Sequence, residues 1–215
     1  MDLLLQFVDI VLHLDKHLAV LVQDYGPWIY AILFVIVFSE TGFVVTPFLP
    51  GDSLLLVAGA LAALGGMDLF LLMGTLIAAA VSGNQVNYHI GRFIGPKVFH
   101  WEDSRFFNKA ALQKTHAFYE KHGGKAVVIS RFLPLFRTFV PFVAGVGTMG
   151  YGTFTAFNVA GATLWVVSLS LVGYWFGNEP WVKQNLSAVI VGTIVVSMIP
   201  VVIGWWQHRR GEKTA

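Results

Sequence analysis

The sequence predicts an all-α polytopic membrane protein: an inverted repeat of amphipathic helix, re-entrant hairpin and transmembrane helix, followed by a C-terminal transmembrane helix. The 215 residues are 56% hydrophobic and only 12% charged, with a mean hydropathy of +0.68. A soluble domain of this length needs far more charge to cover its surface. Apolar runs recur at 29–45, 69–80, 159–172 and 186–206, and several approach the roughly 20 residues that span a bilayer core. We therefore expect one membrane domain over residues 1–215.

The first repeat is expected to cover residues 1–95 and to begin with an interfacial helix. Residues 3–22 mix leucines and valines with aspartates, histidines and a lysine. These polar residues interrupt any spanning run, and the pattern is typical of an amphipathic helix that lies on the membrane. No basic segment with a small-residue cleavage site begins the chain, so we expect no cleavable signal peptide.

Residues 28–66 are predicted to form a re-entrant hairpin rather than a full span. Two apolar legs flank a segment that holds Pro47, Pro50 and Gly51, and this combination cannot continue a helix. Irregular backbone at membrane depth is tolerated only where it is buried in protein or lines a wet cavity. In the alternative, residues 28–45 cross the membrane completely and the N-terminus moves to the cytoplasmic side.

A true transmembrane helix is predicted at 69–94, and the polar segment 95–125 that follows carries most of the lysines. Within that segment, 108–122 is expected to be a second amphipathic helix, ended by Gly123 and Gly124. The lysines of this segment and the basic tail place both on the cytoplasmic side. The C-terminus is therefore expected in the cytoplasm.

The second repeat, 96–178, follows the same order as the first. Its re-entrant element at 126–148 is broken by prolines, its transmembrane helix is expected at 151–177, and a last transmembrane helix follows at 186–206. Each hairpin carries a proline followed by Ala-Gly, and the two spans end on similar Gly- and aromatic-rich segments. Weak internal symmetry with interrupted helices is the signature of inverted-repeat transporters.

Four ionisable residues fall at membrane depth: Glu40, Asp52, Arg131 and Arg137. A lone charge at the bilayer centre costs about 2.5–3.5 kcal/mol on insertion scales. Four unpaired charges would cost on the order of 10 kcal/mol, comparable with the stability of a whole domain. We therefore expect the two acids of the first hairpin to face the two arginines of the second, around a small wet cavity at the midplane.

These residue types favour a site for an anionic headgroup coupled to protons. Arg131 and Arg137 suit bidentate phosphate binding, and a broken-helix N-terminus at Gly51 and Ser53 adds amide donors. A buried carboxylate whose charged form is disfavoured can carry a proton, which is the role expected for Glu40 or Asp52. The alternative is a structural ion-pair cluster that pins the two hairpin tips together.

The same residues lie in segments that resemble the DedA family of bacterial inner-membrane proteins. The matching segments are 40–42, 47–55, 58–62, 87–92, 118–125, 131–134 and 137–145, and the likeness extends over nearly the whole chain. The resemblance implies two facing re-entrant hairpins, a place in the bacterial inner membrane, and a role in membrane homeostasis linked to the proton motive force. It also implies transport of a lipid such as undecaprenyl phosphate, with the essential acids and arginines at the four buried positions. Many members have Asp where this chain has Asn84, which cannot titrate.

Other polar residues receive secondary roles. Asn84 can hydrogen-bond a headgroup or a neighbouring helix, Arg92 is expected to reach lipid phosphates at the membrane surface, and His89 is a candidate pH sensor or a structural histidine. The tryptophans at 165, 175, 181, 205 and 206 are expected in interface belts or in packing. The histidines and aspartate at 13, 15 and 17 are expected on a solvated helix face, so we predict no metal site and no cofactor.

The predicted function is a transporter or flippase for an anionic lipid, and the chain is not expected to be an enzyme. A membrane-embedded lipid phosphatase would need a nucleophile with its base, and Ser53, Ser130 and Thr138 have no evident base partner. A proton/cation antiporter and a structural or assembly factor are the remaining alternatives. The expected partners are membrane lipids, the lipid substrate and protons, with no nucleic acid. The oligomeric state, a homo-oligomer included, is left open.

Overall fold

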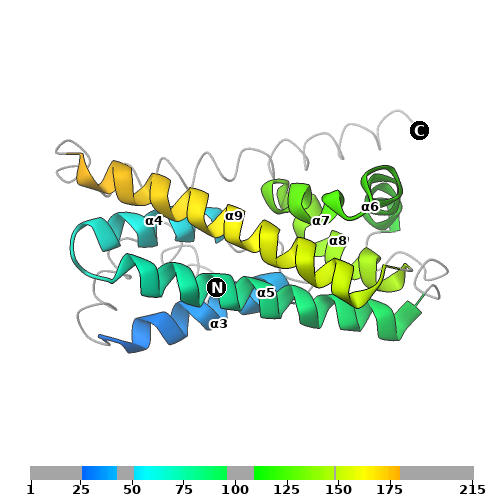
Figure 1. Ribbon diagram of the computed structural model, residues 1–215, viewed down its shortest axis with the longest axis horizontal. Helices are drawn as coiled ribbons and strands as arrows, with labels where there is room; N and C mark the ends of the chain where they lie inside the picture. The colour runs from blue at the N-terminus through cyan, green and yellow to red at the C-terminus, as the bar shows by residue number, and fades with distance from the viewer. Residues whose placement is uncertain (1–25, 43–50, 96–108, 148, 180–215) are drawn as a thin grey trace, which may run out of the picture. The chain divides into compact units, whose positions relative to one another are not determined.

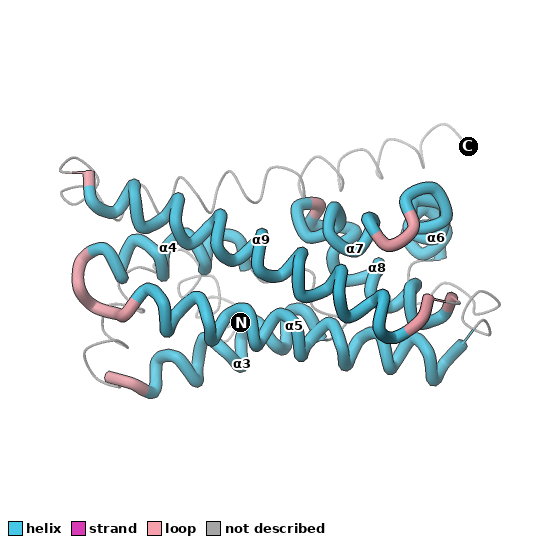
Figure 2. The backbone as a smooth tube through the Cα atoms, in the orientation of Figure 1, coloured by secondary structure: helices cyan, strands magenta, loops and turns pink. Residues whose placement is uncertain are grey.

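The computed structural model describes residues 26–42, 51–95, 109–147 and 149–179, and all the regular structure in these ranges is helical (Figures 1 and 2). The predicted amphipathic helix at 3–22, the predicted last span at 186–206 and the C-terminus lie outside the described residues. The chain separates into two compact units. The larger runs over 30–49 and 70–168, and the smaller includes 50–69 and 169–178.

Two helices are long and apolar enough to cross a membrane. They are α5, Leu69–Ile94, and α9, Tyr151–Asn178. At 1.5 Å per residue, their 26 and 28 residues rise about 39 and 42 Å, more than the roughly 30 Å of a hydrocarbon core. Their bounds agree with the spans predicted at 69–94 and 151–177 to within one residue.

The helices on either side of the proline-rich segment are much shorter. Helix α3, Trp28–Gly42, has 15 residues, and α4, Gly51–Ala63, has 13. Each rises only about 20 Å, so neither crosses a bilayer core by itself. Residues 43–50 between them, which hold the two prolines of the predicted tip, lie outside the described residues.

The second broken element consists of three short helices. They are α7, Lys125–Ile129, the 3₁₀ helix η2, Ser130–Phe132, and α8, Pro134–Val146. The break falls at Leu133, whose backbone is extended (φ −116°, ψ 101°) because the ring of Pro134 disfavours a helical residue before it. Helix α8 also contains Pro141, which has no N–H to donate to the carbonyl of Arg137.

Helix α6, Lys109–His122, is the predicted second amphipathic helix. It ends at Gly123, which has a φ of +56° and donates its N–H to the Tyr119 carbonyl at 2.7 Å. A left-handed residue at this position suits glycine, which has no Cβ. Phe118 and Tyr119 pack on a buried cluster that includes Tyr88, Val140 and Phe154, so α6 is fastened to α5, α8 and α9 of the larger unit.

In the larger unit, α5 and α8 approach so closely that only glycine fits at two positions. A Cβ on Gly91 of α5 would overlap the carbonyl of Phe142, and a Cβ on Gly145 of α8 would overlap the carbonyl of Tyr88. Each glycine therefore packs on the residue three positions before the other glycine. The result is a reciprocal backbone contact along the two helices.

In the smaller unit, α4 and the end of α9 pack in the same way. A Cβ on Gly59 would overlap the carbonyl of Ser170, and a Cβ on Gly173 would overlap the carbonyl of Leu56. The spacing of three residues is again reciprocal. Each proline-flanked helix thus packs on a long helix through one pair of glycines. The Ala-Gly pairs that the two hairpins share in the sequence supply Gly59 and Gly145.

These contacts predict that alanine substitution has very different effects on stability at two glycines of α5. Gly91→Ala is expected to lower the free energy of unfolding by about 1–3 kcal/mol, because the added methyl group meets backbone that cannot move aside. Gly74→Ala, also on α5, is the matched control, since nothing lies within 4 Å of its would-be Cβ. Thermal unfolding in detergent measures both variants. Equal melting temperatures for the two would contradict the close α5–α8 contact.

Candidate functional site

The candidate site is a small buried cavity inside the larger unit. Its lining residues come from α3, α5, η2, α8 and α9: Thr41, Asn84, Arg131, Arg137 and Trp165. The volume of the cavity is about 10 Å³, which is about what one water molecule needs. In the described conformation the site therefore holds two arginines around a space smaller than a lipid headgroup.

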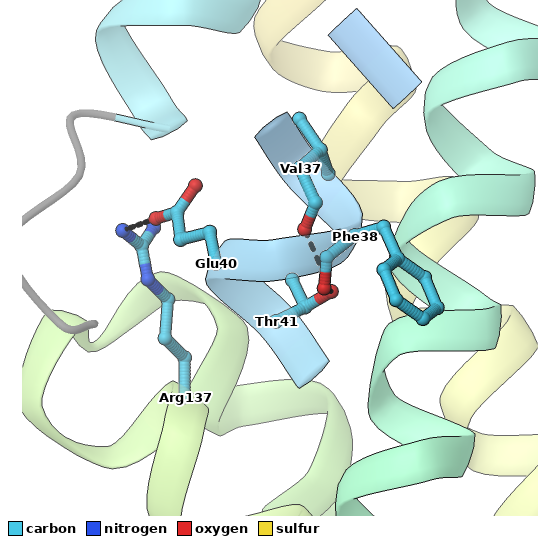
Figure 3. Close-up of polar contacts among 5 residues, drawn as sticks. All are labelled: Val37, Phe38, Glu40, Thr41 and Arg137. Carbon is cyan, nitrogen blue, oxygen red and sulfur yellow. Dashed lines mark hydrogen bonds and ion pairs between the residues drawn. The ribbon is translucent and has the colours of Figure 1, made fainter. Parts of the chain in front are cut away.

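Glu40 and Arg137 form a buried ion pair across this site. Arg137 donates from Nη2 to Oε1 of Glu40 (Figure 3). The Glu40 residue is 0% exposed and Arg137 is 8% exposed. Glu40 lies in the last turn of α3, and Arg137 lies in α8, just after Pro134 starts that helix. The expected contact between an acid of the first hairpin and an arginine of the second is present for this pair.

Arg131 is buried as deeply, at 3% exposed, but its partners are neutral. Its Nη2 donates to Oδ1 of Asn158 at 2.6 Å and to the Ala80 carbonyl at 3.3 Å. Its Nε has no hydrogen-bond partner among the described residues. A buried guanidinium with neutral partners keeps an uncompensated positive charge beside the cavity. The sequence predicts the same role for the two arginines, but their electrostatic environments therefore differ.

Asn84 joins this network in either orientation of its amide group. In one orientation Nδ2 donates to Oδ1 of Asn158 at 3.1 Å. In the other, its oxygen accepts from Nη2 of Arg131 at 2.9 Å and its nitrogen donates to the Thr41 carbonyl at 3.3 Å. The second orientation gives Arg131 one more neutral acceptor. In this orientation Asn84 therefore contacts Arg131 directly.

Asn87, one turn further along α5, connects the two broken elements. Its Nδ2 donates to the carbonyl of Thr138 at 2.8 Å and to the carbonyl of Thr41 at 3.3 Å. Thr41 follows Glu40 in α3, and Thr138 follows Arg137 in α8. The side chain of Asn87 thus fixes the distance between the backbones that carry the two members of the ion pair.

Trp165 packs against both arginines. The guanidinium carbons of Arg131 and Arg137 lie 5.9 and 5.8 Å from its ring centroid. The residue is 2% exposed. It therefore lies in the buried site rather than in an interface belt, and of the two expectations for this tryptophan only packing holds.

The remaining predicted residues lie apart from this cavity or in the other unit. Gly51, Asp52 and Ser53 form the first turn of α4 in the smaller unit, where Gly51 and Ser53 are buried and Asp52 is half-buried. Their part in headgroup binding and proton transfer stays a prediction. His89 and Arg92 are exposed near the end of α5. Nδ1 of His89 lies 2.7 Å from the Gln85 carbonyl, and Arg92 donates to the Tyr88 hydroxyl at 3.0 Å.

The described part of the chain contains no cluster of three His, Cys, Asp or Glu side chains that could hold a metal ion. The histidine- and aspartate-containing segment at 13–17 lies outside the described residues. The polar groups that converge on the cavity are donors for an anion, namely two guanidinium groups and the side-chain amide of Asn84. Donors of this kind suit binding of an anionic oxygen group.

The sequence alone did not identify four residues of this site: Thr41, Asn87, Asn158 and Trp165. An asparagine or a tryptophan inside a long span carries no charge and gives no energetic signal as strong as that of an arginine. The available signal was the presence of polar amides within apolar helices, since polar groups in membrane spans usually face a neighbouring helix.

The described residues are all helical where they are regular, and two of their helices are long and apolar enough to cross a membrane, which is compatible with a membrane protein. A model of the VTT domain matches residues 49–175. Protein DedA of Escherichia coli strain K12 is 54% identical over 217 residues, covering 100% of this chain and 99% of the relative. The chain therefore belongs to the VTT-domain family, the DedA family of membrane proteins.

Two further relatives are named as membrane proteins. Uncharacterized membrane protein ML0287 of Mycobacterium leprae is 43% identical over 83% of this chain and 80% of its own length. Inner membrane protein YqjA of Escherichia coli strain K12 is 37% identical over 86% of this chain and 87% of its own length. No solved structure matches the chain.

Asn87→Leu tests whether the α5 amide holds the two broken elements together. The change removes both hydrogen bonds and leaves two buried carbonyls without this donor, so the expected loss of stability is about 1–3 kcal/mol. Asn178→Ala is the control, because Asn178 is exposed and bonds only within its own helix. Thermal unfolding in detergent should separate the two variants clearly. Similar melting temperatures would show that Asn87 does not fasten α3 to α8.

Proposed function

We propose that this protein is a transporter or flippase for an anionic lipid, with undecaprenyl phosphate or a phospholipid as the substrate. The observation that carries the proposal is the pair of buried arginines, one neutralised by Glu40 and the other held by neutral groups. Burying a charge without a counter-charge is costly, so an ionisable residue buried at membrane depth marks a candidate site for binding or transfer. A phosphate headgroup supplies the missing negative charge and accepts several N–H groups at once.

Arginine suits this role better than lysine would. Its planar guanidinium presents paired N–H donors that match the oxygens of a phosphate, and its charge persists when it is buried. Arg131 and Arg137 line the same cavity. A headgroup between them would replace the single carboxylate oxygen of Glu40 with several phosphate oxygens.

Proton coupling follows because the phosphate headgroup and the carboxylate of Glu40 compete for Arg137. When a phosphate takes the guanidinium, the buried carboxylate of Glu40 loses its contact with Arg137. Loss of a neighbouring cation favours the neutral acid form of a buried carboxylate. Binding of the anion is therefore accompanied by uptake of a proton on Glu40. When the ion pair between Glu40 and Arg137 forms again, the anion and the proton are released. This exchange makes transport dependent on the proton motive force.

The described conformation is a closed state in this scheme. A cavity of about 10 Å³ admits a water molecule but no headgroup. Entry of a substrate requires the helices around the cavity to separate, as in alternating-access transporters with sites at the bilayer midplane. The short α3 and α4, and the broken η2–α8 element, are proposed to be the re-entrant hairpins that carry the site.

The matching glycine contacts support the proposed inverted repeat. Gly59 with Gly173, and Gly145 with Gly91, use the same reciprocal spacing of three residues.

We propose that the protein lies in the bacterial inner membrane with its C-terminus in the cytoplasm, and that it supports envelope homeostasis. The inner-membrane name of the relative YqjA supports the location.

A proton/cation antiporter is the second candidate, and the buried carboxylate of Glu40 is the observation that favours it. In that case protons cross the membrane without any lipid substrate. The dependence on added cation distinguishes the two functions in vesicles without polyprenyl phosphate, because only an antiporter dissipates a pH gradient faster there when its cation is supplied. We propose no enzymatic reaction; release of inorganic phosphate from lipid would identify a phosphatase instead.

Reconstituted vesicles test the proposed transport directly. Wild-type protein is expected to move undecaprenyl phosphate between leaflets faster when a pH gradient is imposed. Arg137→Ala should reduce the rate at least about 100-fold, since removal of a buried charge-assisted contact costs several kcal/mol, and Arg137→Lys should restore only part of it because the bidentate geometry is lost.

Lys125→Ala is the control for this test, since Lys125 is exposed on α7 and does not line the cavity. The melting temperatures of all variants are measured in the same detergent, so that a loss of activity is not a loss of fold. Transport by folded Arg137→Ala at the rate of Lys125→Ala would refute the arginine site.

A further inference from the structure

Three residues on one face of α9 contact the side chain of Arg131. Asn158, Gly161 and Trp165 succeed one another at spacings of three and four residues, so they share a helix face. Asn158 accepts the hydrogen bond from Nη2 of Arg131 at 2.6 Å. A Cβ on Gly161 would lie 3.2 Å from Cδ and 3.3 Å from Nε of Arg131, so the glycine leaves room for that side chain. The guanidinium group of Arg131 lies over the Trp165 ring.

Trp165 also reaches the second arginine. Its ring centroid lies at nearly equal distances from the two guanidinium carbons, 5.9 Å for Arg131 and 5.8 Å for Arg137. The arginines flank the break at Leu133, one in η2 and one in α8. The ring of Trp165 therefore lies within cation–π distance of two charged groups that come from either side of the chain break.

The electrostatic reason is that two neighbouring guanidinium groups repel each other in a buried site. The face of an indole ring carries partial negative charge, and it attracts cations within about 6 Å more strongly than the ring of phenylalanine does. This attraction grows when water is excluded. It requires no carboxylate, so it leaves the hydrogen-bonding edges of the guanidinium groups available to an anion.

We infer that Trp165 is a positioning residue that holds Arg131 and Arg137 as a pair, so that one anionic headgroup contacts both. This inference rests on the proposed function. A carboxylate in its place would neutralise the arginines and compete with the substrate, and an aliphatic side chain would fill the space without attracting either charge. The indole ring does neither.

Two substitutions separate the role of the aromatic face from that of packing. Trp165→Phe keeps a smaller ring, and Trp165→Leu keeps apolar bulk without a ring. In reconstituted vesicles the apparent KM for undecaprenyl phosphate is expected to rise about tenfold or more in Trp165→Leu, and by a smaller factor, about threefold, in Trp165→Phe. The maximal rate should change less than the apparent KM in both. Trp175→Leu, an exposed tryptophan on the same helix, is the matched control and should behave as wild type.

Some outcomes of the transport test overturn the inference while the proposed function stands. The inference fails if Trp165→Leu has the same apparent KM as the Trp175→Leu control. It also fails if Trp165→Leu and Trp165→Phe, both folded, raise the apparent KM equally, because that result would show that only packing matters. The expected order of apparent KM, with leucine above phenylalanine and phenylalanine above wild type, supports the inference.

A second measurement tests the pairing without transport. Arginine-selective ¹⁵N labelling reports the side-chain Nε–H resonances, with Arg131→Lys and Arg137→Lys used for assignment. Addition of dodecyl phosphate to wild-type protein should shift both resonances at one common ligand concentration, and the concentration for half the shift should rise about tenfold in Trp165→Leu. Separate midpoints for the two arginines, or no shift at all, would overturn the inference. If vesicles show no lipid transport but these shifts appear, the proposed function fails and the pairing by Trp165 remains.

Discussion

The ion pair between Glu40 and Arg137 is the interaction on which the site depends. Both side chains are buried, and removing one partner from such a pair typically costs about 3–5 kcal/mol because a charge is left without compensation. The pair also joins α3 to α8, two short helices that belong to different broken elements of the chain. Asn87 supports it by binding the carbonyl groups next to both charged residues. In the proposed mechanism, a headgroup that enters the site therefore replaces the carboxylate without leaving Arg137 unpaired.

The neighbouring helices are arranged to keep the second arginine available. Arg131 contacts the amide of Asn158, a backbone carbonyl and an indole face, and none of these carries a full negative charge. In the proposed transporter, these neutral partners hold the side chain in place and leave its charge to act on the headgroup. The glycine contact between α5 and α8 brings the two helices close enough for the α5 amides to reach α8. Close packing and a polar site are thus linked, because the hydrogen bonds of Asn87 require that short distance.

Within the described residues, the sequence was sufficient to predict the helices and to single out the buried charged residues, but not to predict the partners of those charges. Prolines and glycines marked where α3, α4 and α8 begin or end, and apolar length marked α5 and α9. Glu40, Arg131 and Arg137 were recognised because a charge at membrane depth is costly wherever it lies. Which acid meets which arginine depends on packing that no spacing reveals. For the same reason Asn87, Asn158 and Trp165 were missed, since their importance comes from the groups that they contact. The expectation that both acids face both arginines is met for Glu40 with Arg137, while the role of Asp52 remains a prediction.

The central claim is that Glu40 and an anionic headgroup compete for Arg137, so that binding of the anion takes up a proton. Calorimetry of dodecyl phosphate binding to the purified protein, repeated in buffers with different ionisation enthalpies, measures the protons exchanged for each ligand bound. Linkage predicts an uptake of about one proton for the wild-type protein and about none for Glu40→Gln, after subtraction of the ligand's own protonation measured in the same buffers. Binding of dodecyl phosphate with no proton uptake in the wild-type protein, or with the same uptake in Glu40→Gln, would contradict the claim.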